Sequence, residues 1–151
     1  MILLNPKKHV RRYASEADRQ LMLKTIEFFE TKGRGKLKKD DHERVWYQDF
    51  LDFQAEHKLF ARLLTPAKYG GGDSEYRWDT FRNCEFNEIL GFYGLPYWYT
   101  WQVTILGLGP IWISDNEEVK ERAAAALKEG GVFGFGLSEK DHGADISSTE
   151  M

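Results

Sequence analysis

Apolar side chains recur at helical spacing in the first part of the chain. Met22, Ile26 and Phe29 are separated by four and then three residues, which places them on one face of a helix. The residues before this stripe, 15–18, read Ser-Glu-Ala-Asp. The serine hydroxyl can accept a hydrogen bond from the free amides of a first helical turn. The carboxylates lie near the positive end of the helix dipole. We therefore predict a helix that follows this capping box and ends near Gly33.

A second apolar stripe lies between an acidic start at residues 40–43 and Pro66. Because proline lacks the N–H that the next turn needs, Pro66 should end the helix. The basic run 32–39 contains two glycines, and we predict that it is a solvated connection between the first and second helices. The stripe steps by four, three, four and three residues through Trp46, Phe50, Phe53, His57 and Phe60.

The middle of the chain predicts a loop and two more helices. Residues 65–72 end in three consecutive glycines, which supply backbone conformations that side chains forbid, so this segment is a loop. Apolar spacing over 78–93 predicts a helix. Pro96 suits the first turn of a further helix, which should run to about Leu106. There, two glycines and Pro110 interrupt the pattern.

The pattern changes near the end of the chain. Residues 114–117 form another capping box, which opens a helix over 116–128 that stops at a glycine pair. Residues 132–137 then alternate large apolar and small side chains, as a strand does. A strand needs partners for its backbone groups, and we find no second convincing strand. The pattern therefore predicts five or six helices and one strand whose partners lie outside this chain.

Composition and charge exclude several classes of protein. The chain is 42% hydrophobic, 15% aromatic and 30% charged, which is typical of a globular protein. No apolar run approaches the ~20 residues of a membrane-spanning helix. The net charge of −3 argues against nucleic acid as a partner. The basic first fourteen residues lack serine, so we predict no targeting role and expect a cytoplasmic protein. Cys84, the single cysteine, excludes an internal disulfide, and we expect a buried thiol.

Candidate metal ligands and acid–base pairs are weak in this sequence. A metal-binding helical bundle needs Glu three residues before each ligand histidine, but His42 and His57 follow a lysine and a glutamine. We therefore expect no metal site and interpret His57 as a residue at the edge of the core. Glu85 and Glu88 have the spacing of an acid–base pair, but a solvated or capping role is the favoured interpretation.

Nucleotide binding and nucleophilic catalysis are equally weak. Gly107 and Gly109 follow a helix and run into Pro110, whereas a dinucleotide-binding motif follows a strand and opens a helix. Ser138 has no evident histidine and aspartate partners in its sequence context. We assign no catalytic residue in this chain.

Two segments, in order, resemble the acyl-CoA dehydrogenase family. The first is residues 64–72, Leu-Thr-Pro-Ala-Lys-Tyr-Gly-Gly-Gly. The second is the charged helix that begins near Asp115, followed by residues 134–145, Gly-Phe-Gly-Leu-Ser-Glu-Lys-Asp-His-Gly-Ala-Asp. The resemblance implies a mainly α fold with an up-and-down helical bundle over 1–131, and the first part of a truncated β domain over 132–151.

The resemblance also implies a partial flavin site. Leu137, Ser138, Gly143 and Ala144 match positions that contact FAD, and the last of these also matches a substrate contact. Ser138 stands where the family usually has threonine. The hydroxyl and the backbone amide of that threonine form hydrogen bonds with the pyrimidine side of the flavin. Gly143 would let the chain pass close to the cofactor. Ala144 stands where serine is usual, so a hydroxyl contact is lost.

The implied chemistry is α,β-desaturation of an acyl-CoA thioester by an FAD enzyme, reoxidised by electron-transfer flavoprotein or a similar acceptor. By analogy, Tyr99, Gln102 and Leu106 would form one wall of the acyl pocket, although the same aromatic cluster could be plain core. The family's catalytic base lies in later domains, so this chain should be inactive alone and part of a homo-oligomer when intact. Alternatives are an acyl-CoA oxidase, a flavin monooxygenase, or a helical interaction module without catalysis.

Overall fold

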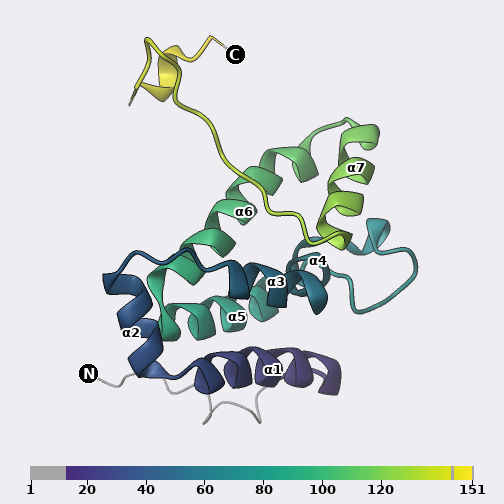
Figure 1. The fold of residues 1–151 in the computed structure, drawn as a ribbon. Helices are drawn as coiled ribbons and strands as arrows, with labels where there is room; N and C mark the ends of the chain where they lie inside the picture. Colours follow the sequence, from purple (N-terminus) through teal and green to yellow (C-terminus); the bar gives the residue numbers. More distant parts are fainter. Residues whose placement is uncertain (1–12, 144, 151) are drawn as a thin grey trace.

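The structure, a computed structural model, describes residues 13–143 and 145–150, so the basic residues 1–12 and Ala144 lie outside the description. Within the described residues the chain is mainly helical, as predicted, and no strand is present. The helices exceed the predicted five or six, and the up-and-down arrangement and the β segment stay predictions. The helices are α1 Glu16–Lys32, α2 Arg34–His42, α3 Gln48–Glu56, α4 Leu59–Leu64, α5 Thr80–Tyr93, α6 Leu95–Ile113 and α7 Glu117–Lys128, with short 3-10 turns η2 Ala67–Tyr69 and η3 Ile146–Ser148 (Figure 1).

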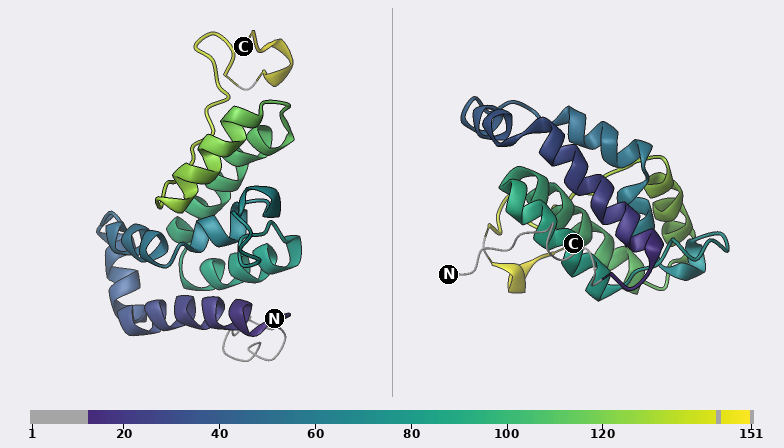
Figure 2. Two further views of the ribbon diagram at one scale, coloured as in Figure 1. Left: turned by 90° about the vertical axis from the view of Figure 1, so that its right-hand side faces the viewer. Right: turned by 90° about the horizontal axis from the view of Figure 1, so that it is seen from below.

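The short helix α4 lies at the centre of the fold and contacts α3 and α7 (Figures 1 and 2). A helix that is apolar on nearly all sides must be surrounded by other elements, because most of its surface is unsuited to water. Five of its six residues are buried, namely Leu59, Phe60, Ala61, Leu63 and Leu64.

Aromatic rings connect α4 to the helices around it. The ring of Phe60 meets Trp101 of α6 edge-on, with centroids 5.2 Å apart, and Trp101 meets Phe86 of α5 at 4.7 Å. Phe50 of α3 meets Phe60 at 6.2 Å. Edge-to-face pairs are the favoured geometry of packed aromatic rings. Four helices therefore share one aromatic core.

The remaining helices form layers around this core. Helices α5 and α6 pack together on either side of the turn at Gly94, α1 packs on α5, and α2 stands across the end of α1 (Figures 1 and 2). Helix α7 packs on α6 and α4. The chain leaves α7 through Gly130, whose φ of +88° favours glycine. Its carbonyl accepts a bond from Gln54 Nε2 of α3 at 2.8 Å, which ties the chain exit to the core.

Helix caps confirm one predicted boundary and correct another. Ser15 Oγ accepts from the N–H of Asp18 at 3.1 Å, so α1 begins as predicted. The capping box predicted at Ser114 is wrong, because Ser114 Oγ donates to the carbonyl of Ile111 in the last turn of α6. Asn116 is the N-cap of α7 instead, and its side chain accepts from the N–H of Val119 at 3.1 Å.

The basic run predicted as a solvated connection is the helix α2. Gly33, with φ of +75°, ends α1 and turns the chain directly into α2. Leu37 is buried. The carboxylate of Asp40 forms ion pairs with Lys36 and with Lys32, whose Nζ lies 3.2 Å from Asp40 Oδ2. One apolar anchor and these ion pairs outweigh the low helix propensity of Gly35.

The single long helix predicted to end at Pro66 is broken into α3 and α4. The break is at Lys58, whose φ of +52° is left-handed, and His57 caps α3. Because the chain turns there, Phe60 enters the core, whereas Trp46 precedes α3 and is 64% exposed. The regular spacing of the stripe concealed this change of direction.

Helix α6 continues through the predicted interruption at Gly107, Gly109 and Pro110 and ends at Ile113. Pro110 removes one backbone hydrogen bond in the last turns of the helix. Trp101 and Leu108 on the inner face are fully buried. Their burial outweighs the weak local propensity, as tertiary packing commonly does.

A buried ion pair fixes α1 against α5. Asp18 Oδ1 lies 2.8 Å from Arg82 Nε, without hydrogen-bond geometry, and both side chains are 3% exposed. Arg77 Nη2 donates to the other oxygen, Oδ2, at 2.6 Å. Arg82 also donates to the carbonyl of Glu75 at 3.0 Å, which extends the tie to the loop before α5.

The substitution Asp18→Ala should lower the free energy of unfolding by about 3–5 kcal/mol, because it leaves Arg82 buried without its counter-charge. Chemical denaturation followed by circular dichroism measures this change. Asp41→Ala, on the exposed side of α2, is the matched control and should change stability by less than about 0.5 kcal/mol. Equal effects of the two substitutions would contradict the assignment.

Candidate functional site

The predicted acyl-wall residues lie on the outward face of α6. At about 100° per residue, Tyr99, Gln102 and Leu106 fall within about 60° of one another. Tyr99 is 59% exposed and Leu106 40%, while Gln102 is half-buried. The opposite face, with Trp101 and Leu108, enters the core. These three residues are therefore not plain core, and their role in binding stays a prediction.

The outward face of α6 is uncharged from end to end and mostly apolar, with Gln102 as a polar exception. Leu95 is 69% exposed and Ile113 is 85% exposed, and Tyr99 and Leu106 lie between them on the same face. The whole helix, Leu95–Ile113, contains no charged residue. An exposed apolar face without charge is typical of a surface that another molecule or segment covers.

The segment after α7 crosses α6 before it leaves the helical body (Figure 1). The N–H of Phe133 donates to Thr104 Oγ1 of α6 at 3.4 Å. Phe133 packs against the core, whereas Val132 is 49% exposed and Phe135 is 45% exposed. The contact with α6 is therefore confined to a short crossing point.

The predicted flavin-contact residues lie beyond that crossing. Ser138 Oγ donates to the carbonyl of Gly143 at 3.4 Å, which closes a loop over 138–143. Leu137 is half-buried, and both Ser138 and Gly143 are exposed. Ala144 is outside the described residues. Ser138 and Gly143 thus meet in one loop, but the bond that joins this segment to α6 is at Thr104, not at Tyr99 or Gln102.

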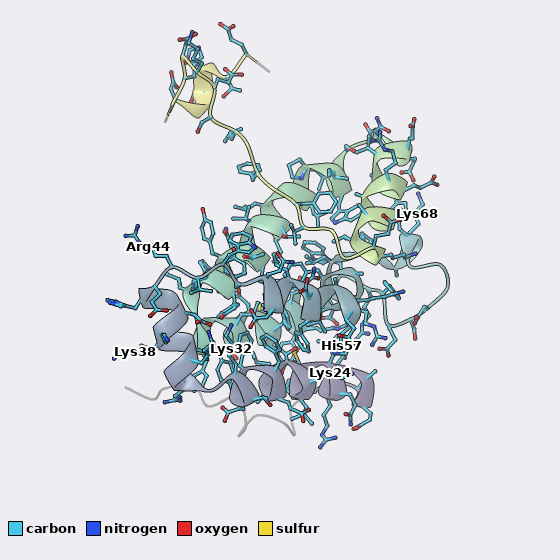
Figure 3. All side chains as sticks on the ribbon, in the orientation of Figure 1. Lys24, Lys32, Lys38, Arg44, His57 and Lys68 are labelled. Carbon is cyan, nitrogen blue, oxygen red and sulfur yellow. The ribbon has the colours of Figure 1, made fainter. Side chains whose placement is uncertain are left out.

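The Pro-Ala-Lys-Tyr-Gly loop is held against α7. Tyr69 donates its hydroxyl hydrogen to Glu117 Oε2 at 2.9 Å, and Lys68, labelled in Figure 3, donates to the same oxygen at 2.5 Å. Lys128 donates to the carbonyl of Tyr69 at 2.9 Å. The Tyr69 ring also stacks on Trp112, with centroids 5.7 Å apart. The structure therefore brings this loop to the helix that leads into residues 130–138.

Hydrogen bonds to the Glu117 carboxylate favour its ionised form. Bonds from Lys68, then Lys120, then Tyr69 lower the pKa of Glu117 from 4.5 to about 2. A carboxyl group whose pKa is lowered by folding contributes stability at pH values above its pKa in the unfolded chain. The contribution is lost as pH falls through the folded value. The contact between the loop and α7 should therefore weaken between about pH 4.5 and pH 2.

A titration by NMR should give a midpoint near pH 2 for the Glu117 side chain, below the ordinary 4.5 for this group. The variant Glu117→Gln should lose the charge and weaken the attachment of the Tyr69 loop at neutral pH, seen as faster amide exchange over residues 67–70. Glu118→Gln, one residue along α7, is the matched control and should leave this exchange unchanged. A midpoint at or above 4.5 would rule out the three-bond arrangement.

The other candidates from the sequence do not assemble into a site. The favoured solvated or capping role fits the exposed Glu88, whereas Glu85 is buried, so the solvated interpretation is wrong for Glu85. The ring of His57 lies edge-on to Phe53 at 4.8 Å, at the edge of the core. Cys84 is exposed, which corrects the expected buried thiol, because its side of α5 faces away from α1 and α6. Among the described residues no group of three potential ligands could hold a metal ion.

Two open cavities of about 600 Å³ each were not predicted from the sequence. One lies between α1 and the break between α3 and α4, and Lys24 and His57 (Figure 3) line it together with the ion pair Arg62–Glu75. The other lies between α2 and the turn at Gly94. Their residues come from separate segments of the chain, so no local sequence signal could have revealed them.

No family model, curated protein or solved structure matches this chain. In the part of the chain that the structure describes, none of the helices has the length and apolar character to cross a membrane.

Proposed function

We propose that this chain is the N-terminal helical part of an FAD-dependent acyl-CoA dehydrogenase, which desaturates an acyl-CoA thioester between its α and β carbons. The observation that carries the proposal is a juxtaposition. The glycine-rich segment with the Leu-Ser-Glu motif leaves the helical body where it crosses α6, whose outward face is uncharged and apolar. An enzyme that oxidises acyl groups with a flavin needs its flavin-contact segment close to its acyl-binding wall.

The acyl chain is apolar, and a binding wall for it must present apolar side chains without charge. In this proposal Tyr99, Gln102 and Leu106 provide that wall. They lie on one face of α6, and Tyr99 and Leu106 are already exposed. A β domain that continues residues 132–151 would cover the opposite side of the channel, above an up-and-down bundle over 1–131.

The loop over 138–143 would hold the pyrimidine side of FAD, which when bound would supply the hydride acceptor. Ser138 fits this role because its hydroxyl is exposed and its bond to the Gly143 carbonyl is long, at 3.4 Å. It can therefore turn toward a ligand acceptor. The backbone at Gly143 allows close approach, and Ala144 would offer its amide but no hydroxyl. The base that removes the α proton would lie outside this chain, so the chain alone would be inactive.

The intact protein would be a cytoplasmic homo-oligomer with electron-transfer flavoprotein or a similar acceptor as its redox partner. Expression of the polypeptide extended beyond Met151 in the reading frame of its gene tests the proposal. We expect a yellow protein that reduces a dye when acyl-CoA is added. A stable, folded and colourless extended protein would contradict it. Hydrogen peroxide formation or oxygen-dependent hydroxylation would instead identify an oxidase or a monooxygenase.

In that extended protein, Ser138→Ala should lower the flavin reduction potential by about 30–60 mV, because a donor to the negatively charged reduced flavin is lost. Ser138→Thr keeps the hydroxyl and should stay near the potential of the unmodified protein. Spectroelectrochemical titration of the flavin measures both variants. Equal potentials for Ser138→Ala and Ser138→Thr would remove Ser138 from the flavin site.

A second candidate is a helical interaction module without redox chemistry. The exposure of Leu95, Tyr99 and Ile113 on α6 favours it, because such a face suits a protein partner as well as an acyl group. The same extended protein separates the two functions. The module would remain colourless and would bind its partner through α6.

A further inference from the structure

The segment after α7 is held to α6 by a hydroxyl whose direction is fixed. Thr104 Oγ1 donates to the carbonyl of Thr100 at 2.8 Å, and Thr104 is fully buried. A hydroxyl has one hydrogen to donate and two lone pairs. Because the hydrogen is used within α6, the oxygen is presented as an acceptor, and it accepts from the N–H of Phe133 at 3.4 Å.

One helical turn further, the segment lies against a glycine. A Cβ atom at Gly107 would lie 2.4 Å from the carbonyl oxygen of Gly134 and 3.0 Å from Phe133 Cβ. Carbon atoms in ordinary contact are about 3.5–4.0 Å from their neighbours. The atoms in the way are backbone and Cβ atoms, which cannot turn aside as the end of a long side chain can. Gly109, two residues further along α6, has nothing within 4 Å of the corresponding position.

We propose that Gly107 is a positioning residue, which forms with Thr104 a notch on α6 that fixes where residues 133–134 cross the helix. The notch combines a directed acceptor with the absence of a side chain. A single long hydrogen bond would not by itself define one position, but close backbone contact beside it does.

The notch matters because the two halves of the proposed site extend from it. Leu106 and Gln102 lie on α6, and Ser138 lies four residues beyond Gly134, at most about 13 Å of extended chain. The crossing therefore sets how far the flavin-contact loop can lie from the acyl wall. This consequence rests on the proposed function, whereas the notch itself does not.

A side chain at position 107 should move the segment rather than the helix. Trp101 and Leu108 are fully buried in the aromatic core, so α6 cannot shift without disturbing four helices. Residues 135–138, in contrast, extend away from the helical body (Figure 1). Gly107→Ala should therefore release the crossing and leave the helical fold intact.

The test measures the distance from α5 to the loop by electron paramagnetic resonance. One spin label is attached to Cys84, which is exposed, and the other to Lys140→Cys in the same chain. The unmodified notch should give one narrow distance distribution. In the Gly107→Ala variant this distance distribution should broaden or shift, and its main peak should be lost. Gly109→Ala is the matched control, because it makes the same change in helix propensity at an open position, and should retain the peak.

Circular dichroism and the thermal midpoint should show that both variants fold, so the loss of the peak reports position and not unfolding. If Gly107→Ala does not fold, Thr104→Val tests the other half of the notch and should also broaden the distribution. Three results would each overturn the proposal. The first is a main peak that is retained in Gly107→Ala or in Thr104→Val, and the second is its loss in Gly109→Ala. The third is a broad distance distribution in the chain without any of these substitutions. The measurement uses no flavin, so a colourless extended protein would refute the proposed function and leave this result unaffected.

Discussion

The contact between Phe60 of α4 and Trp101 of α6 is the interaction on which the rest of the structure depends. Trp101 is fully buried, and its ring and that of Phe60 both meet Phe86 of α5, while Phe60 also reaches Phe50 of α3. One pair of rings thus joins four helices. Because α4 is apolar on nearly every side, it can exist only inside this cluster, and its burial determines how the surrounding helices are placed.

This core also determines which part of α6 remains available for function. Trp101 and Leu108 use the inner face of the helix, which leaves an outer face without charge. Between the two faces, Thr104 and Gly107 receive the segment that follows α7. One helix therefore serves as core element, as the wall of the proposed acyl channel and as the support for the proposed flavin loop. A change in its packing would affect all three.

The sequence predicted those helices whose ends carry an unambiguous chemical signal. Ser15 and Gly33 mark α1 correctly, because each satisfies or redirects the backbone within a few residues. The errors occurred where a local signal competed with distant packing. The left-handed turn at Lys58 is invisible in a regular apolar stripe, and Pro110 was expected to end a helix that the core in fact continues. Asn116 replaced Ser114 as a cap because both residues have suitable side chains, and only the path of the chain selects one.

The sequence by itself determined the mainly helical class, the loop over 65–72 and the absence of charge on α6. It also placed Tyr99, Gln102 and Leu106 on a common face, since helical periodicity is a local property of the chain. Only the tertiary structure decided that this face is outward, that Glu85 is buried and Cys84 exposed, and that Gly107 receives the backbone of Gly134. The physical reason is that burial and close approach depend on which distant segments meet, and these contacts join residues far apart in the sequence.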